Sequence, residues 1–286
     1  MRIGAVYPQT EAGGDPRNVR AFGLAMEDMG LDHLLVFDHV AGASHADRDP
    51  PLLGPYTEHD PFHDPLVMFA YLAGITQKIE FATGVLILPQ RQTVLVAKQA
   101  ADLDLLSGER LRLGVGTGWN YVEYEALGQD FHVRGARMDE QVDFLRKLWS
   151  EPLLTFEGKY DRIVRGNLNI RPKRQIPIWM GGFTDPAFRR AVKLGDGFIF
   201  ATRNHADLEK GWARMRELLA QAGRSEATLG RDYIVLRAAG AEEVAGDLKR
   251  WRDGGGTHGT ISSLGRGFRE IQQHVDFVGE VLGKLR

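Results

Sequence analysis

The chain has 286 residues, is 43% hydrophobic and 26% charged, carries a net charge of −2 and contains no cysteine. Lys and Arg are spread along it, so no basic tract predicts a nucleic-acid or anionic-membrane partner. The lack of Cys excludes disulfides, thiolate metal sites and thiol nucleophiles. With no apolar run of about 18 residues and a strand pattern that begins directly after Met1, we expect a cytoplasmic protein.

The first part of the chain alternates strand and helix patterns. In order it predicts strand 3–7, helix 15–29, strand 33–37, helix 65–75, strand 79–88, helix 94–106 and strand 111–115. A long segment rich in Gly, Pro, His and Asp separates the second strand from the second helix. The fourth strand runs into a glycine turn and a polar connection.

The alternation continues in the second part. After helix 134–149 and a surface excursion over 151–173, the sequence predicts strand 176–180, helix 185–194, strand 197–200, helix 206–222, strand 233–238, a helix through Trp251, strand 257–262 and helix 268–285. Eight strands alternating with helices predict a single (β/α)8 TIM barrel over 1–286, with insertions after strands 2 and 4. The active site is then expected at the C-terminal ends of the strands.

The third strand carries the longest apolar run and is interrupted by Gly84. A glycine inside a strand indicates either a β-bulge without chemistry or a close approach of a ligand to the backbone, and the residue alone leaves both open.

His39, after Asp38 at the end of strand two, is the best candidate for proton chemistry, because an imidazole beside a carboxylate can be held in one tautomer. A hydrogen-bonded structural histidine is the alternative. A metal site is a weaker interpretation, since Pro61 argues against a helical His59/His63 pair and no third ligand stands out. The crowded polar residues of this loop are His45, His59, Asp60, His63 and Asp64.

Other strand ends carry glycine or arginine. Gly116-Thr117-Gly118 lacks the third glycine and acid of a dinucleotide fingerprint and the lysine of a P-loop. Trp119 offers an aromatic face or an apolar wall. The pair Gly181-Gly182 leaves room for a ring packed on backbone, and the arginines Arg203 and Arg266 lie where barrels often hold phosphate.

Taken together, these segments resemble the luciferase-like monooxygenase superfamily, and within it the deazaflavin (coenzyme F420) oxidoreductases. The resemblance spans nearly the whole chain. It is carried by Phe37-Asp38-His39, by Ala82-Thr83-Gly84-Val85 with Leu88-Pro89-Gln90-Arg91, by Leu113 to Trp119 followed by Glu123 and Glu125-Ala126-Leu127-Gly128, by Arg134 to Glu140, and by Arg171 to Lys173 ahead of Ile176 to Gly182 and Gly195 to Gly197.

The resemblance implies a homodimeric barrel in which a flavin-like ring lies over a strand-three bulge with a cis peptide bond, here Gly84-Val85. It implies His39 as the catalytic residue. The cofactor-binding residues that we expect are Asp38, His39, Thr83, Gly84, Val85, Gly116, Thr117, Gly118, Gly181, Gly182, Arg203 and Arg266.

The sequence departs from the sugar-phosphate dehydrogenases of this group. The tryptophan and glutamate that those enzymes place after the histidine and the glycine turn correspond here to Ala43 and Trp119. Trp119 cannot act as a general acid, which argues against glucose 6-phosphate. A pocket walled by Trp119, Tyr121 and Phe62 favours an apolar or aromatic substrate.

The leading hypothesis is therefore an F420-dependent oxidoreductase that moves a hydride to or from a small organic molecule, with His39 as proton donor or acceptor. The first alternative is an FMN-dependent two-component monooxygenase supplied by a separate reductase. The second alternative is a non-catalytic flavin-binding protein, and a metal hydrolase ranks last.

Overall fold

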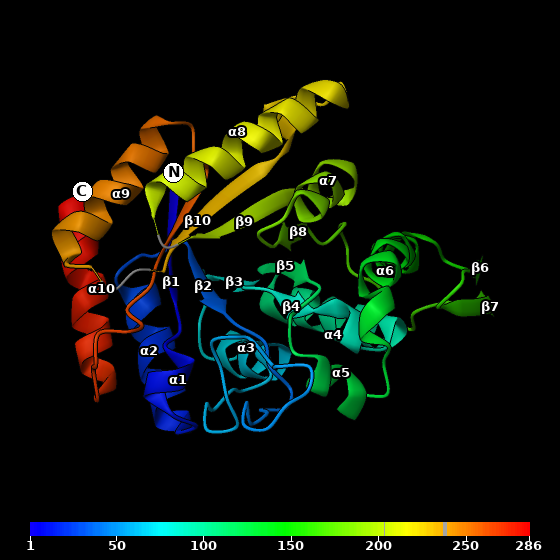
Figure 1. Ribbon diagram of the computed structural model, residues 1–286, viewed down its shortest axis with the longest axis horizontal. Helices are drawn as coiled ribbons and strands as arrows, with labels where there is room; N and C mark the ends of the chain where they lie inside the picture. Colours follow the sequence, from blue (N-terminus) through cyan, green and yellow to red (C-terminus); the bar gives the residue numbers. More distant parts are fainter. Residues whose placement is uncertain (203, 237–238) are drawn as a thin grey trace.

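The computed structural model describes residues 1–202, 204–236 and 239–286 (Figure 1). Within these ranges one parallel sheet has the order β3-β2-β1-β11-β10-β9-β8-β5-β4, and an additional β3–β5 pairing closes it. β3 and β4 are two pieces of the third barrel strand, so the predicted (β/α)8 class is confirmed. The sheet strands are β1 (Arg2–Val6), β2 (His33–Val36), β3 (Glu80–Thr83), β4 (Leu86–Ile87), β5 (Leu111–Gly116), β8 (Ile178–Gly181), β9 (Gly197–Thr202), β10 (Gly230–Val235) and β11 (His258–Ile261).

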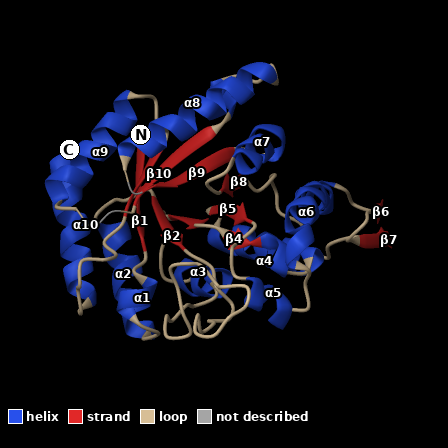
Figure 2. Ribbon diagram, in the orientation of Figure 1, coloured by secondary structure: helices blue, strands red, loops and turns tan. Residues whose placement is uncertain are grey.

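Helices surround the barrel, as Figure 2 shows. They are α1 (Gln9–Ala12), α2 (Pro16–Asp28), α3 (Pro65–Ala73), α4 (Thr93–Ser107), α5 (Tyr121–Ala126), α6 (Arg134–Ser150), α7 (Asp185–Leu194), α8 (His205–Gln221), α9 (Ala241–Asp253) and α10 (Ile271–Leu285). Asp15 and Asp64 precede α2 and α3, and each carboxylate accepts hydrogen bonds from N–H groups of the first turn that the helix leaves free. A proline, which has no N–H to satisfy, follows at the first position of each helix. Among the described residues, no helix combines the length and apolar character needed to cross a bilayer.

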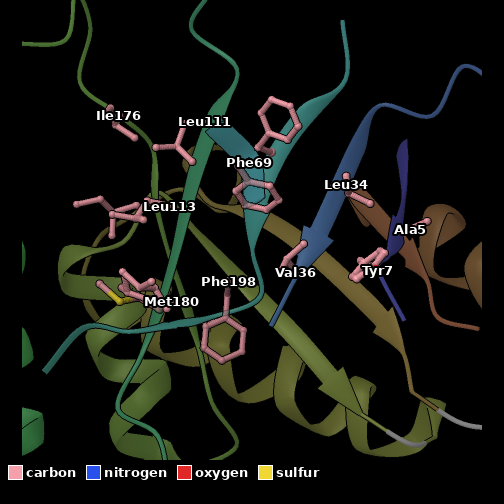
Figure 3. Packing of buried hydrophobic residues seen from close by; sticks show 14 of the residues in the cluster. Ala5, Tyr7, Leu34, Val36, Phe69, Leu111, Leu113, Ile176, Met180 and Phe198 are labelled. Atoms are coloured by element: carbon pink, nitrogen blue, oxygen red, sulfur yellow. The ribbon is translucent and has the colours of Figure 1, made fainter. Parts of the chain in front are cut away.

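Alternate strand residues divide between two apolar layers. Those pointing outward pack under the helices in one large core, which includes Leu34, Leu113, Met180 and Phe198 (Figure 3). The intervening residues fill the barrel interior. The members of this inner layer are Val6, Leu35, Ala82, Trp179, Ile199 and Ile234. The two-residue strand period thus produces a packed interior and an outer core from the same strands.

A buried polar layer lies at the N-terminal half of the barrel interior. The Asp232 carboxylate accepts hydrogen bonds from Arg112 Nη1 at 3.1 Å and from Thr260 Oγ1 at 2.8 Å, and His33 Nε2 lies 3.4 Å from it. His33, Arg112 and Asp232 are all buried. Burial raises the pKa of Asp232, but the hydrogen bond from His33 and the charge of Arg112 outweigh it and hold the pKa well below its usual range.

Insertions lie where the sequence predicts them, after the second and fourth barrel strands. The segment 37–64 is a long loop, while the expected polar connection after β5 contains the helix α5 and the 3-10 turn η2 (Phe131–Val133). Asn120 caps α5 by accepting from Glu123 N–H at 3.3 Å, and six residues are too few to show a helical apolar period. The excursion over 151–173 contains the hairpin β6 (Leu154–Glu157) and β7 (Arg162–Gly166), which projects from the barrel in Figure 1. The remaining short turns are η1 (Leu88–Gln90) and η3 (Glu226–Thr228).

The cis peptide bond expected at Gly84-Val85 is not found. Among the described residues the cis bond lies between Asp49 and Pro50, and Gly84-Val85 is trans. Gly84 N–H donates to Val36 O at 2.7 Å, which extends the pairing of β3 with β2 before the chain bends into β4. The strand is therefore interrupted by a bend with ordinary peptide geometry.

Candidate active site

An apolar floor closes the barrel interior at the C-terminal ends of the strands. It is formed by partly buried side chains packed on the inner layer, namely Phe37, Val85, Ala201, Leu236 and Leu264. Above part of this floor lies a cavity of about 1120 Å³ whose lining includes Ala201, Leu236 and Leu264. Its volume suits a flat ligand of cofactor size, and its position is the one at which TIM barrels carry their chemistry.

The cavity walls come from six parts of the chain. Phe183, Phe188 and Phe200 give it aromatic surface, and Gly54, Pro55 and Tyr56 of the long loop form its roof. Its polar lining residues are Thr10, Glu11, Thr202, Asn204, Asp207 and Lys210. Apolar surface therefore predominates in the lining, and its charged residues are Glu11, Asp207 and Lys210.

His39 lies behind the roof at the end of β2, with its side chain 10% exposed. Its ring is surrounded by three aromatic rings, with centroid distances of 5.1 Å to Tyr56, 4.9 Å to Phe62 and 5.6 Å to Trp119. Tyr56 also lines the cavity, whereas His39 does not, so the imidazole contacts a cavity-lining ring. The structure thus brings together His39 with two of the predicted substrate-binding residues, Phe62 and Trp119.

The carboxylate beside the imidazole belongs to Glu123. His39 Nδ1 lies 3.3 Å from Glu123 Oε2, and the Glu123 side chain is 1% exposed. Burial alone would raise the pKa of Glu123, but hydrogen bonds from His39, Ala41 N–H and Gln90 lower it below its usual value. The sequence analysis did not predict that Glu123 holds His39. The available signal was an acidic residue four positions after Trp119, at the start of a helix that was not predicted.

Asp38 faces away from the imidazole. Its Oδ2 accepts from Ile87 N–H at 2.8 Å, and its Oδ1 accepts from Arg91 Nη2 at 2.7 Å. Arg91 Nη1 also binds Asp64, the capping residue of α3, at 2.9 Å. Burial raises the pKa of Asp38 despite the adjacent guanidinium. Asp38 therefore ties β2 to the bend after β3 and carries the strand end on which His39 lies.

The strand-end glycines pack against Val85. A Cβ on Gly116 would lie 2.5 Å from Val85 Cγ2, and a Cβ on Gly181 would lie 2.6 Å from Val85 Cγ1. Gly182 has φ +147 and lines the cavity. The glycines that were predicted to leave room for a ring thus leave room for the Val85 side chain, which is part of the floor.

The roof is held by residues of the β5–α5 connection. Tyr121 Oη donates to Pro50 O at 2.7 Å, and a Cβ on Gly54 would lie 2.3 Å from the Trp119 indole. His45 Nε2 also lies 2.9 Å from Tyr56 O. Trp119 therefore contacts both the imidazole and the roof, while Tyr121 binds loop backbone.

The remaining predicted site residues have structural contacts. Thr83 Oγ1 donates to Gly114 O at 2.6 Å, and Thr117 O accepts from Tyr124 Oη at 2.7 Å. Gly118, at φ +63, packs on Ile87. Arg266 donates to Ala239 O at 2.7 Å with its guanidinium 3.8 Å from the Phe277 ring centroid, and Arg203 lies outside the described residues. In the described part of the chain, no three His, Asp or Glu side chains are grouped as metal ligands.

The chain is therefore a (β/α)8 barrel with a cavity and a strand-end histidine at its C-terminal face. Residues 1–273 match the family described as luciferase-like monooxygenase, and the chain belongs to that family.

The chain is also similar to curated proteins over most of its length. An uncharacterized protein of Mycobacterium tuberculosis is 33% identical over 205 residues, which cover 70% of this chain and 71% of the relative. The F420-dependent glucose-6-phosphate dehydrogenase of Kineococcus radiotolerans is 30% identical over 243 residues, covering 83% of this chain and 68% of that enzyme.

Solved structures support the fold. An F420-dependent secondary alcohol dehydrogenase in complex with an F420-acetone adduct matches 100% of this chain and 99% of its own with a TM-score of 0.80 at 17% identity. The coenzyme F420 dependent tetrahydromethanopterin reductase of Methanopyrus kandleri matches 100% of both chains with a TM-score of 0.74 at 15% identity.

Proposed function

We propose that the protein is a coenzyme F420-dependent oxidoreductase that transfers a hydride between the deazaflavin and a small organic substrate. The observation that carries the proposal is the glycine-backed apolar floor beneath a cavity of about 1120 Å³, next to a histidine held by a buried carboxylate. The family and the F420-dependent relative at 30% identity support the same assignment.

The floor fits a planar ring. Val85 presents its side chain between Gly116 and Gly181, neither of which has a Cβ that would lift a ring off the surface. In this proposal the ring of the bound cofactor lies on Val85, and the cavity takes the rest of the molecule. The deazaflavin supplies hydride transfer. The protein's share is orientation, exclusion of water and movement of a proton at His39.

The surroundings of His39 favour an apolar or aromatic substrate. Tyr56, Phe62 and Trp119 contact the imidazole from three sides and offer no charge to a phosphate group. The nearby cation Arg91 is already paired with Asp38 and Asp64. Glucose 6-phosphate is therefore a poor candidate, in spite of the relative's name.

An FMN-dependent monooxygenase served by a separate reductase is the second candidate, because the family description and a monooxygenase neighbour, RslO1 from Streptomyces bottropensis at a TM-score of 0.77, point to oxygen chemistry on the same barrel. In this proposal the same apolar floor would take either ring. A non-catalytic flavin-binding role is the third, and retention of a carboxylate-held histidine counts against it.

The deciding experiment titrates the purified protein with oxidised F420 and, separately, with FMN, following absorbance and Trp fluorescence. Micromolar F420 binding with much weaker FMN binding supports the proposal, and the reverse order moves the protein to the monooxygenases. A His39→Ala variant as active as the wild type would remove the catalytic assignment.

We further propose a cytoplasmic homodimer. Exposed apolar side chains gather on the neighbouring helices α3 and α4, with Val67 66%, Leu95 51% and Leu106 80% exposed. Light scattering on Leu95→Glu tests the dimer, since a charge on a buried interface opposes association. The cytoplasmic assignment rests on the absence of cysteine.

A further inference from the structure

We propose that Glu123 is a positioning residue that holds the proton of the neutral His39 imidazole on Nδ1, so that Nε2 is the atom that exchanges a proton with the substrate. The proposal rests on the proposed function for its catalytic meaning. The tautomer itself is a property of the protein alone.

The geometry leaves one arrangement of donors and acceptors. A carboxylate only accepts, so at 3.3 Å the His39 Nδ1 donates to Glu123 Oε2. Nε2 makes no hydrogen bond to any residue that the structure describes. The lowered pKa of Glu123 keeps this carboxylate ionised at neutral pH, where it accepts from Nδ1–H and so favours that tautomer.

The second oxygen of Glu123 fixes the backbone that carries His39. Oε1 accepts from Val40 N–H and from Ala41 N–H, the latter at 3.0 Å. Gln90 Nε2 donates to Oε2 at 3.0 Å, which orients the carboxylate from a third element. Glu123 thus holds both the ring and the chain immediately after it, and a 1% exposed side chain with four donors has little freedom to rotate.

Other ionisable groups leave this proton arrangement intact. Burial and Asp60 raise the pKa of Tyr56 to about 12, so its hydroxyl stays neutral across the working range. The Asp38 carboxylate is engaged by Arg91 and Ile87, and His45 contacts Trp119 without reaching the His39 ring. Glu123 is therefore the only ionised partner of His39 among the described side chains around it.

The test is Glu123→Gln. Its amide can accept from the loop N–H groups through oxygen while presenting an NH₂ group to Nδ1, which would then accept, so that the proton moves to Nε2. Histidine ¹⁵N spectra of the protein without cofactor, assigned with His39→Ala, should show Nδ1–H for the wild type and at least a tenfold shift of the tautomer ratio toward Nε2–H in the variant. Glu123→Asp keeps the charge and should retain the wild-type tautomer.

Glu27→Gln is the matched control. Glu27 also clamps a loop by accepting backbone N–H groups, from Gln77 at 2.8 Å and Ile79 at 3.2 Å, but it has no histidine partner. It should leave the His39 tautomer unchanged. For a substrate turned over with F420, Glu123→Gln should lower kcat by roughly 10²–10⁴-fold with a smaller change in KM, as loss of the correct tautomer does in hydrolases.

An unchanged ¹⁵N pattern in a folded Glu123→Gln protein would overturn the proposal. A wild-type spectrum that shows the proton of the neutral His39 ring on Nε2 would also overturn it. If F420 fails to bind while the tautomer responds as described, the proposed function fails and the role of Glu123 stands.

Discussion

The packing of Val85 between two glycines predicts a specific pattern of steric coupling. In Gly181→Ala the new Cβ would lie 2.6 Å from Val85 Cγ1, about 1 Å closer than the ~3.5–4.0 Å at which carbon atoms pack. Gly181 is not at positive φ, so the backbone accepts alanine and the cost is steric. Overpacking lowers the free energy of unfolding by about 1–3 kcal/mol. Replacing glycine with alanine also lowers the entropy of the unfolded chain, which stabilises the folded state by about 0.4–1 kcal/mol. We expect Gly181→Ala to lose roughly 1–2 kcal/mol of unfolding free energy.

Removing the obstructing methyl groups should reverse the loss. Val85→Ala alone should cost at most about 1.6 kcal/mol, at about 0.8 kcal/mol per buried carbon for a partly exposed side chain. The double variant should then be more stable than the sum of the two single effects by about 1–3 kcal/mol. Gly116→Ala, whose Cβ would meet Val85 Cγ2 at 2.5 Å, should show the same rescue.

Urea unfolding of the wild type, both single variants and the double variant measures the coupling, and the F420 titration reports on the site. A coupling energy below about 0.5 kcal/mol would refute the packing argument, since distant sites add within that margin. If stability recovers in the double variant, and F420 binding is lost in Gly181→Ala and in the double variant but kept in Val85→Ala, Gly181 also leaves room for the ring. If the free energy of unfolding and F420 binding both recover, the only role of Gly181 is to leave room for the Val85 side chain.

Three further outcomes are expected. Asp232→Asn should lose about 3–5 kcal/mol in urea unfolding because it leaves the Arg112 guanidinium buried without its counter-ion; a loss under 1 kcal/mol would contradict this. Burial and the charge of Arg112 lower the pKa of His258 to about 3. At this group the folded state therefore binds fewer protons than the unfolded state between about pH 6.5 and pH 3, so His258 alone should make stability fall by at most about 1.4 kcal/mol per unit as the pH drops through this window. His258→Asn should flatten that slope, and equal slopes would exclude His258 as its source. Tyr121→Phe removes the bond to Pro50 O and should speed proteolysis of the loop over 40–64, with little effect on global unfolding; unchanged cleavage would show that the bond does not hold the roof.

Much of the site could be located from local sequence. Strand periodicity, the Asp-Pro helix starts and the alternation of elements predict the barrel, and the barrel rule then places His39, Gly116 and Gly181 at one rim. These are local properties, because each depends on spacing within a short segment. The missed helix α5 is too short for its periodicity to be visible.

Which side chains meet across the rim depended on the tertiary structure. Asp38 is adjacent to His39 in sequence, yet neighbouring residues point to opposite sides of an extended chain, and Asp38 binds Arg91 instead. The carboxylate that reaches the imidazole is Glu123, 84 residues away, brought there because β5 pairs with β3 and β4 and β3 in turn pairs with β2. Local sequence patterns predicted the alternating elements and the rim on which the candidate site lies. Only the folded barrel decided the partner of His39, the trans peptide at Gly84-Val85 and the use of the glycines, because each depends on contacts between strands that are distant along the chain.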